Sequence, residues 1–551
     1  MISPLRSRLL AGAAALGALI LPDAASAQAF DGTPIVVHGS VTRSTGPGTE
    51  TIFVETPSAV VNWIPNSNAD PTPFDFLPAG NVATFQNSGQ TENFMILNRI
   101  LPDNGRPIVF NGTVISQLAA NSGTAPGGTV VFYTPGGIVI GGTAVFDVGN
   151  LLLTTIDPVL DPSGNFFVGN SFKLSGAKTD SASFVRIQPG ARISATGQGS
   201  YVAAVAPIVR QSGAVRVNGS VAYVAAEAVN LTIDDGLFDI QVKVGSSSAA
   251  ATLDHRGSTG GPASGGPGDN QAIYMVAVPK NEAVSLLLRG NAGYDVAANA
   301  AQENGAIILS AGYNIDRSAT QATPGSEAPA AIDIRQANVT SDLTGVATAA
   351  AAATAFGGEA LNFAGDVTLA APEAALGSEG GILRVGGNAV VTTGRRGDFN
   401  FNAATGGQAA LFARGGGAVQ IAGSARVSAG TLSRPGEDAT GGDATAVANG
   451  GSIDIGGGLL MEADAEAGSG DLVDPGRATA GNARLAALNG GKVQVLGAAE
   501  VTASAAGAPG FGAGDGAPGP AEGGFASLAA SGGEIELGSL TLRASGQGGP
   551  A

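Results

Sequence analysis

The side chains best suited to catalysis or metal binding are few in this sequence and lie far apart. The chain contains two histidines, His38 and His255, and no cysteine. A zinc site or a Ser-His-Asp triad needs a histidine near further ligands or a carboxylate, and neither histidine has an acidic cluster at ligand spacing. We therefore predict no catalytic residue, no metal site and no cofactor. Both histidines are expected in solvated turns or loops.

Carboxylates at alternate positions offer one other kind of chemistry. Glu462, Asp464 and Glu466 would lie on one face of a strand, because successive strand side chains point to opposite faces. Oxygen ligands in such a row could hold a calcium ion, whereas a solvated acidic face needs no ion. The sequence favours the solvated face and leaves the calcium site as the alternative.

Composition limits the classes of protein to which the chain could belong. The 551 residues include 86 glycines and 44% hydrophobic residues, but only 5% are aromatic. Small and β-branched side chains punctuated by glycine favour many short strands joined by tight turns. A net charge of −17 disfavours nucleic acid as a partner, because nucleic acid binds cationic surfaces. Without cysteine, stability must come from a large continuous core rather than from disulfides.

The first 27 residues have the pattern of a secretory signal. Arg6 and Arg8 precede an apolar stretch, 9–21, and Ala25-Ser26-Ala27 forms a small-residue cleavage site before Gln28. The apolar stretch is too short to span a bilayer comfortably, so we predict cleavage rather than anchoring. The mature chain is therefore expected to be exported.

A repeated pentapeptide is the most informative pattern in the C-terminal half. Each copy has glycine first, aliphatic residues third and fifth, and a polar residue fourth. The five copies begin at Gly381, Gly417, Gly451, Gly491 and Gly533. Alternation with a period of two predicts short strands with one buried face.

Two further short strands accompany the pentapeptides. An apolar strand follows each glycine, and a strand of small residues precedes the last four copies. Three strands joined by glycine-rich corners make one coil of a solenoid, and stacked coils bury their aliphatic positions in columns. The variable segments 431–440, 469–480 and 508–522 are expected to be loops that leave one corner. The predicted fold is all-β, a right-handed parallel β-helix with an N-terminal β cap; a β-propeller is the structural alternative.

Residues 30 to about 175 differ from the repeats, with longer strands and most of the phenylalanine. Five segments of this region resemble, in order and spacing, the secretion domain of filamentous-haemagglutinin-type exoproteins, which are exported by two-partner secretion. The segments are Val60-Val61-Asn62-Trp63, Leu97-Asn98-Arg99-Ile100, Gly112-Thr113-Val114-Ile115, Val131-Phe132-Tyr133-Thr134-Pro135-Gly136-Gly137-Ile138 and Val148-Gly149-Asn150-Leu151-Leu152-Leu153-Thr154-Thr155-Ile156-Asp157.

The resemblance implies a secretion motif that the transporter recognises. The implied motif residues are Asn62, Trp63, Asn98, Arg99, Thr134, Pro135, Gly136 and Gly137. The chain departs from the family at Thr134-Pro135-Gly136-Gly137, where the family usually has Asn-Pro-Asn-Gly, and the family's earlier Asn-Pro-Asn-Leu motif has no convincing copy. Proline fixes φ and glycine supplies positive φ, so Pro-Gly-Gly can make the same tight turn.

The resemblance also implies a domain organisation and a function. Residues 1–27 are the signal, 28–250 the secretion domain with the first coils, and 251–551 the Gly/Ala-rich coils with variable loops. The implied partner is an outer-membrane β-barrel transporter of type V secretion, which exports the chain through the periplasm to the cell surface or medium. We predict a monomeric, adhesin-like structural exoprotein without catalysis, whose ligand is a receptor or glycan on a host or neighbouring cell.

Two other functions are compatible with a β-helix. Enzymes that act on polysaccharides share this fold, but outward charges such as Arg384, Asp454 and Glu534 are not grouped by sign. An autotransporter passenger would need a C-terminal barrel of its own, whereas this chain ends in the glycine-rich segment 545–551. That ending also lacks the atypical terminal repeat of most solenoids, so the sequence leaves open whether the chain is full length.

Overall fold

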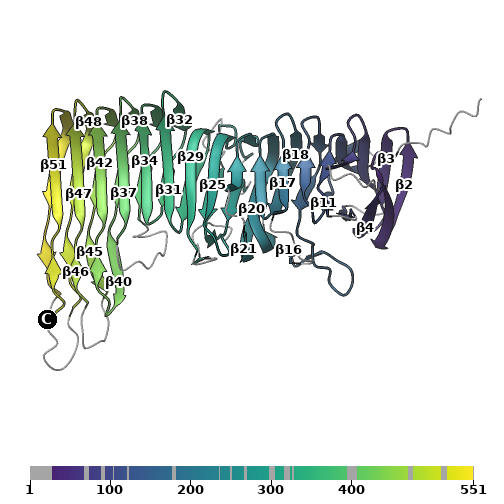
Figure 1. Cartoon of the computed structure of the whole chain (residues 1–551), viewed down its shortest axis with the longest axis horizontal. Coiled ribbons are helices and arrows are strands. Elements are labelled where there is room, and N and C mark those ends of the chain that lie inside the picture. The colour runs from purple at the N-terminus through teal and green to yellow at the C-terminus, as the bar shows by residue number, and fades with distance from the viewer. Residues whose placement is uncertain are drawn as a thin grey trace, which may run out of the picture.

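Parallel strands stack along the whole molecule and form an elongated rod, with the N-terminal strands at one end and the C-terminal strands at the other (Figure 1). In the part of the chain that is described, every regular element is a strand, and no helix is present that could cross a membrane. The signal predicted for residues 1–27 lies outside this part. The computed structural model describes residues 28–549 apart from 67–72, 89–92, 103–104, 121–122, 176–181, 235, 248–250, 266–269, 297–304, 316–322, 325–327, 394–405, 469–475 and 510–517.

Three ladders of hydrogen-bonded parallel strands make up the rod. The first ladder is β4 (Ser58–Pro65), β7 (Met95–Ile100), β11 (Thr129–Tyr133), β14 (Asn150–Thr154), β18 (Arg192–Ala206), β20 (Ala214–Asp234), β24 (Ala272–Ala277), β26 (Ala306–Ala311), β30 (Asp342–Ala347), β33 (Val367–Ala370), β36 (Ala389–Thr392), β39 (Ala425–Ser428), β44 (Leu459–Glu462), β48 (Lys492–Thr502) and β52 (Glu534–Arg543). The second ladder is β5 (Phe74–Leu77), β8 (Ile108–Phe110), β12 (Ile138–Ile140), β17 (Phe184–Ile187), β19 (Ile208–Gln211), β22 (Ala251–His255), β25 (Val284–Ala292), β29 (Ala330–Val339), β31 (Ala350–Phe356), β34 (Glu373–Glu379), β37 (Gln408–Arg414), β42 (Asp443–Asn449), β47 (Asn482–Leu488) and β51 (Phe525–Ser531). The third ladder is β3 (Thr49–Val54), β6 (Val82–Asn87), β9 (Thr113–Ala120), β13 (Val145–Asp147), β23 (Ser258–Gly260), β32 (Ala360–Phe363), β35 (Ile382–Val385), β38 (Ala418–Ile421) and β43 (Ser452–Ile455), together with the adjoining halves of β18, β20, β25, β29, β48 and β52.

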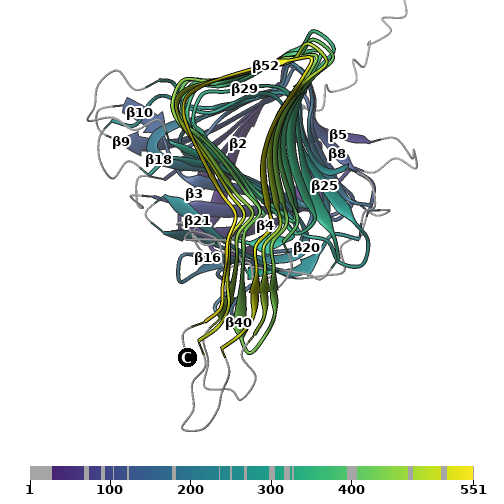
Figure 2. The same cartoon turned by 90° about the vertical axis from the view of Figure 1, so that its left-hand side faces the viewer.

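The chain passes through the second, third and first ladders in turn, so each passage makes one coil. Within each ladder, a strand pairs in parallel with the corresponding strand of the preceding coil, as β38 does with β35 and β43 with β38. Viewed along the rod, the C-terminal coils superimpose closely (Figure 2). The predicted parallel β-helix is confirmed. A propeller is excluded, because its blades are separate four-stranded sheets around a central channel.

The pentapeptides occupy the third ladder in the predicted register. Their third positions form one buried column and their fifth positions another. The first column is Leu383, Val419, Ile453, Val493 and Ile535, and the second is Val385, Ile421, Ile455, Val495 and Leu537. The first four members of each column are at most 2% exposed, which gives each coil an apolar interior without aromatic side chains.

The N-terminal coils are closed by antiparallel strands and filled by aromatic rings. β1 (Gly32–His38) pairs antiparallel with β4, and β2 (Val41–Gly46) forms an antiparallel hairpin with β3. Phe30, just before β1, inserts into the interior with its ring centroid 5.0 Å from that of Trp63 and 4.8 Å from that of Phe76. These strands and rings cover an edge and an interior that would otherwise be open to solvent. The predicted N-terminal β cap is confirmed.

A small antiparallel sheet covers the outer face of the first ladder in the N-terminal half. It consists of β15 (Phe167–Val168), β16 (Ser171–Leu174), the C-terminal half of β20 and β21 (Leu237–Gly245). Its side chains form a second apolar core with outward residues of the ladder, from Val60 on β4 to Ile308 on β26. The first ladder is therefore buried on both faces over this part of the rod. Two further short pairs are formed by β10 (Gly123–Pro126) with β9, and by β27 (Tyr313–Asn314) with β28 (Thr323–Pro324).

The variable segments of the C-terminal repeats leave one corner, as predicted, but they are not simply loops. Their bases form two small parallel sheets that project from the rod (Figure 2). One is β40 (Thr431–Pro435), β45 (Ala465–Gly468), β49 (Ala505–Ala506) and β53 (Gly546–Gln547), and the other is β41 (Ala439–Thr440), β46 (Ala478–Thr479) and β50 (Ala521–Glu522). The sheets enclose a core of alanines, including Ala439, Ala465 and Ala478. Alanine and glycine have weak intrinsic strand preference, so here the neighbouring coil rather than the local sequence determines the strands.

The prediction that both histidines lie in solvated turns or loops is wrong. His38 is half-buried in β1, and His255 is fully buried in β22. The Nδ1 of His255 is 3.0 Å from the carbonyl oxygen of Arg289, which can only accept, so Nδ1 carries the proton. Nε2 then accepts from the Thr259 hydroxyl at 2.9 Å. This hydrogen bonding satisfies the buried ring in its neutral form.

Burial of His255 predicts a pH-dependent stability. Burial lowers the pKa of His255 to about 4, although hydrogen bonding to Arg289 opposes the shift. As pH falls below about 6.5, the unfolded chain takes up a proton at His255 that the folded chain does not. Protonation of His255 in the unfolded chain should therefore lower the free energy of unfolding by about 3 kcal/mol between pH 6.5 and 4. Below pH 4, His255 should contribute no further pH dependence. Urea unfolding of His255→Gln across this range should show a shallower loss than the wild-type protein. Equal slopes in the two proteins would contradict the prediction.

Candidate functional site

The residues of the predicted secretion motif lie together in the first coils. Asn62 and Trp63 are on β4, Asn98 and Arg99 on β7, and 134–137 form the corner between β11 and β12. β4, β7 and β11 are neighbours in the first ladder, where Asn62 pairs with Arg99 and Arg99 with Tyr133. Residues separated by more than 70 positions in the sequence are therefore within two rungs of one another.

The inward side of this site links successive coils through buried hydrogen bonds. The indole Nε1 of Trp63 donates to Oδ1 of Asn98 at 3.0 Å, and Nδ2 of Asn98 donates to the carbonyl oxygen of Val131 at 3.3 Å. Asn98 is fully buried and Trp63 is 1% exposed. A buried amide costs free energy unless it is hydrogen bonded, so these bonds fix how three strands stack.

The outward side is organised around an ion pair. Nη2 of Arg99 lies 2.7 Å from Oδ1 of Asp157 and donates to the carbonyl oxygen of Pro158 at 3.2 Å. Asp157 follows β14, where the chain leaves the coil to form the covering sheet. Burial raises the pKa of Asp157, and the Arg99 guanidinium acts in the opposite direction. Burial, reinforced by the Asp157 carboxylate, also raises the pKa of Tyr133 to about 12, so this phenol stays neutral.

The corner at 134–137 is a tight turn that needs both glycines. Gly137 has a φ of +137°, a positive value that glycine adopts readily because it has no Cβ. A Cβ on Gly136 would lie 1.7 Å from the carbonyl oxygen of Gly105, in the preceding coil. Thr134 is buried, and its backbone N–H donates to the carbonyl oxygen of Thr154 at 3.3 Å. The Thr-Pro-Gly-Gly sequence thus forms the corner between β11 and β12.

Half of the motif residues are buried in the folded chain, and the others are half-buried. Trp63, Asn98, Thr134 and Gly137 are buried, while Asn62, Arg99, Pro135 and Gly136 are half-buried. Sequence comparison alone assigned no role to Tyr133 or Asp157, although both lie inside segments that resemble the family. An acid at the end of an apolar strand was the only available signal for Asp157, and its partner could not be identified without the fold.

The three alternating carboxylates lie elsewhere, where the first ladder meets the projecting sheets. Oε2 of Glu462 is 2.8 Å from Nη2 of Arg426. Asp464 accepts from the backbone N–H of Ser504 at 2.7 Å and from the Thr502 hydroxyl at 3.1 Å. Within the described residues, no three histidine or acidic side chains are grouped so that they could hold a metal ion.

Comparison with known structures finds secretion domains. The chain is similar to the HMW1 secretion domain from Haemophilus influenzae, with 14% identity, a TM-score of 0.36, and coverage of 82% of this chain and 94% of that chain. It is also similar to a filamentous hemagglutinin secretion domain, with 17% identity, a TM-score of 0.33, and coverage of 71% and 99%. No protein-family model and no curated protein sequence matches the chain. Similarities this distant do not assign a function.

The buried hydrogen bonds of Asn98 predict a large difference between two asparagines of the site. Asn98→Ala removes both bonds and leaves the Trp63 indole N–H unpaired in a cavity, so it should destabilise the first coils by about 2–4 kcal/mol. Asn62→Ala removes a half-buried amide whose Oδ1 has no hydrogen-bond partner among the described residues, and should cost less than about 1 kcal/mol. Trp63 is the only tryptophan, so its fluorescence during urea unfolding reports on these coils. Equal losses in the two variants would contradict the assigned role of Asn98.

Proposed function

We propose that this chain is a secreted exoprotein of the two-partner type, exported through a dedicated outer-membrane transporter and acting at the cell surface or in the medium as an adhesive, structural rod. The observation that carries the proposal is the convergence of the motif residues. Segments that resemble the secretion domain in the sequence meet in consecutive coils, joined by the Trp63–Asn98–Val131 bonds and the Arg99–Asp157 ion pair.

The burial of the motif limits when a transporter can recognise it. Side chains such as Trp63 and Asn98 cannot contact a partner once the coils have formed. Recognition through these residues therefore has to precede folding, while the chain is still extended in the periplasm. After export the same residues would lock the first coils, on which later coils stack one at a time. A single set of residues would then serve recognition first and folding afterwards.

The rest of the rod supports a structural and adhesive role rather than a catalytic one. At about 4.8 Å per coil, the first ladder from β4 to β52 extends about 70 Å. The rod carries its exposed side chains in rows along its length, which suits contact with extended or repeated ligands. Soluble domains of this length can present a distal surface away from the cell that secretes them.

Secretion in a reconstituted diderm host tests the proposal. The full chain, co-expressed with an outer-membrane transporter of the two-partner type, should appear in the medium, and without the transporter it should not leave the periplasm. Appearance in the medium independent of any transporter would overturn the proposal.

A pair of variants separates recognition from stability. Asn98→Ala lies in the motif, whereas Leu411→Ala removes a side chain that is 1% exposed in a C-terminal coil and should also cost about 2–5 kcal/mol. If the motif is read by the transporter, Asn98→Ala should reduce secretion at least tenfold while Leu411→Ala leaves most of it intact. Equal reduction in both would show that the motif acts through stability alone.

A further inference from the structure

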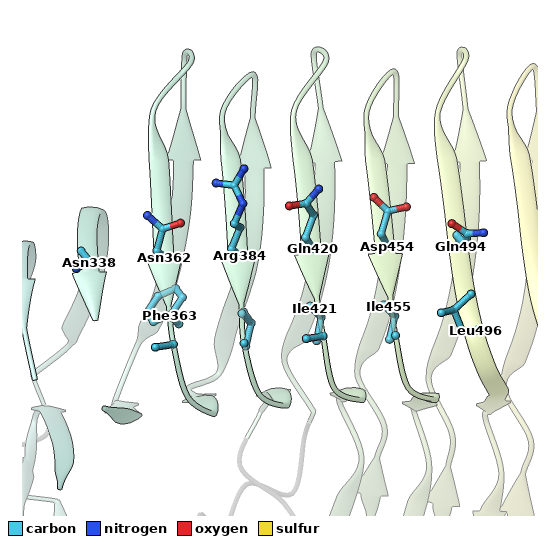
Figure 3. Close-up of a pocket in the computed structure, with 15 residues that line it drawn as sticks. Asn338, Asn362, Phe363, Arg384, Gln420, Ile421, Asp454, Ile455, Gln494 and Leu496 are labelled. Atoms are coloured by element: carbon cyan, nitrogen blue, oxygen red, sulfur yellow. The ribbon is translucent and has the colours of Figure 1, made fainter. Parts of the chain in front are cut away.

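An open groove of about 680 Å³ runs across the third ladder, parallel to the long axis of the rod, at the coils from β29 to β48. One row of its lining is polar: Asn338, Asn362, Arg384, Gln420, Asp454 and Gln494. Figure 3 shows the labelled side chains in line across successive strands, with Phe363, Ile421, Ile455 and Leu496 in a second row beside them. The polar row consists of the outward, fourth positions of the pentapeptides and their counterparts in earlier coils.

The polar row is a consequence of strand register. Each of its members pairs directly with the next in the ladder, as Asn362 does with Arg384 and Gln420 with Asp454. The same register continues beyond the groove at both ends. The complete row is Ser258, Asn291, Asn338, Asn362, Arg384, Gln420, Asp454, Gln494 and Glu536. Polar groups are thus repeated at every coil, about 4.8 Å apart.

Small residues make the groove. The next outward positions along these strands are Ala364, Gly386, Ala422 and Gly456, all exposed. A Cβ on Gly386 would lie 2.3 Å from the carbonyl oxygen of Ala364, so the stacking of the coils itself excludes a side chain there. Leu496, which is 67% exposed, lines the C-terminal end of the groove.

A second groove, of about 440 Å³, continues the first toward the N-terminal coils. The two share Asn338, and the second is lined by Ser258, Asn291 and Tyr294 among others. The binding surface therefore extends over more coils than either groove alone, which suits a ligand that is long and regular.

Charges in the two grooves cancel, in a chain whose net charge is −17. Arg384 and Asp454 balance in the first groove, and Arg216 pairs with Asp295 at 2.8 Å in the second. At the end of the row, Glu536 lies 3.1 Å from Nζ of Lys492. Such a surface offers no cationic footprint for nucleic acid or a highly acidic polymer.

Several groups in the row have their hydrogen-bonding capacity unused. In the described part of the chain, the side chains of Asn362, Arg384 and Gln420 make no hydrogen bond to another protein group. Amides both donate and accept, and guanidinium groups donate in a plane, which matches ligands that carry hydroxyl groups. An extended peptide would add to an exposed sheet edge, but the backbone groups of this face are paired within the ladder.

We propose that this groove binds a neutral linear polysaccharide, lying along the rod with successive sugar rings opposite successive coils. The inference rests on the proposed function and specifies its ligand. Among the residues lining the first groove, Asp454 is the only carboxylate, whereas glycoside hydrolysis uses a pair. The groove binds without cleaving.

The test uses the purified secreted chain and titration calorimetry with two neutral probes, a soluble linear β-glucan and a linear α-glucan, and two acidic probes, alginate and heparin. Wild-type protein should bind at least one neutral glucan. The double variant Asn362→Ala, Gln420→Ala should bind it at least tenfold more weakly, and Ala422→Trp, which fills the groove from an exposed position, should do the same. Gln408→Ala is the matched control, because Gln408 is an exposed glutamine of the same coil on the second ladder.

The outcomes separate the groove from other roles of the same residues. Binding of neither neutral glucan, binding of the acidic probes alone, or wild-type affinity in the groove variants would each overturn the inference. A lowered melting temperature in the double variant with unchanged affinity would also overturn it, because the row would then only stabilise the stack. Secretion of the same variants, measured in parallel, tests export separately. If the chain left the cell without a transporter and still bound glucan, the proposed function would be overturned and the inference about the groove would not.

Discussion

Hydrogen bonding between the backbones of successive coils is the constraint on which the rest of this structure depends. Because each strand pairs in parallel with the equivalent strand one coil earlier, every residue acquires a neighbour of the same orientation above and below it. Inward positions then form the aliphatic columns, such as Leu383–Val419–Ile453, and outward positions form rows, such as Arg384–Gln420–Asp454. The core and the surface are two consequences of one register.

The N-terminal coils add interactions that the later coils do not need. The described residues contain no earlier coil on which the first can stack, and Phe30 and the antiparallel strands β1 and β2 take the place of one. Asn98 and Arg99 then join the next strands through side chains as well as backbone. The segments that resemble a secretion domain are thus also the segments where stacking has to be started rather than continued.

The fold could be predicted from the sequence because alternation and repeat length report directly on register. The pentapeptides identified the third ladder and both of its buried columns, and the aromatic-rich beginning identified the cap. The projecting strands β40 and β45 could not be predicted in this way, because their alanine and glycine carry little preference of their own. His255 was misplaced because a buried histidine is distinguished from a solvated one only by its partners, Thr259 and Arg289, which come from other positions in the chain. The fourth pentapeptide positions were visible as exposed polar residues, but the groove beside them depends on which small residues follow, such as Ala422 and Gly456.

The covering sheet divides the rod into two parts that resist unfolding differently. From β4 to β26 the first ladder is packed on both faces, whereas from β30 onward the described residues place no part of the second core on its outer face. In a solenoid, stability is approximately a sum over coils and their contacts with neighbours. Opening a coil that packs against one core therefore costs less free energy than opening a coil that packs against two. Amide hydrogens should therefore exchange faster toward the C-terminal coils, and a pulling force should peel the rod from that end. A rod built in this way would keep its N-terminal end folded while its C-terminal end yields.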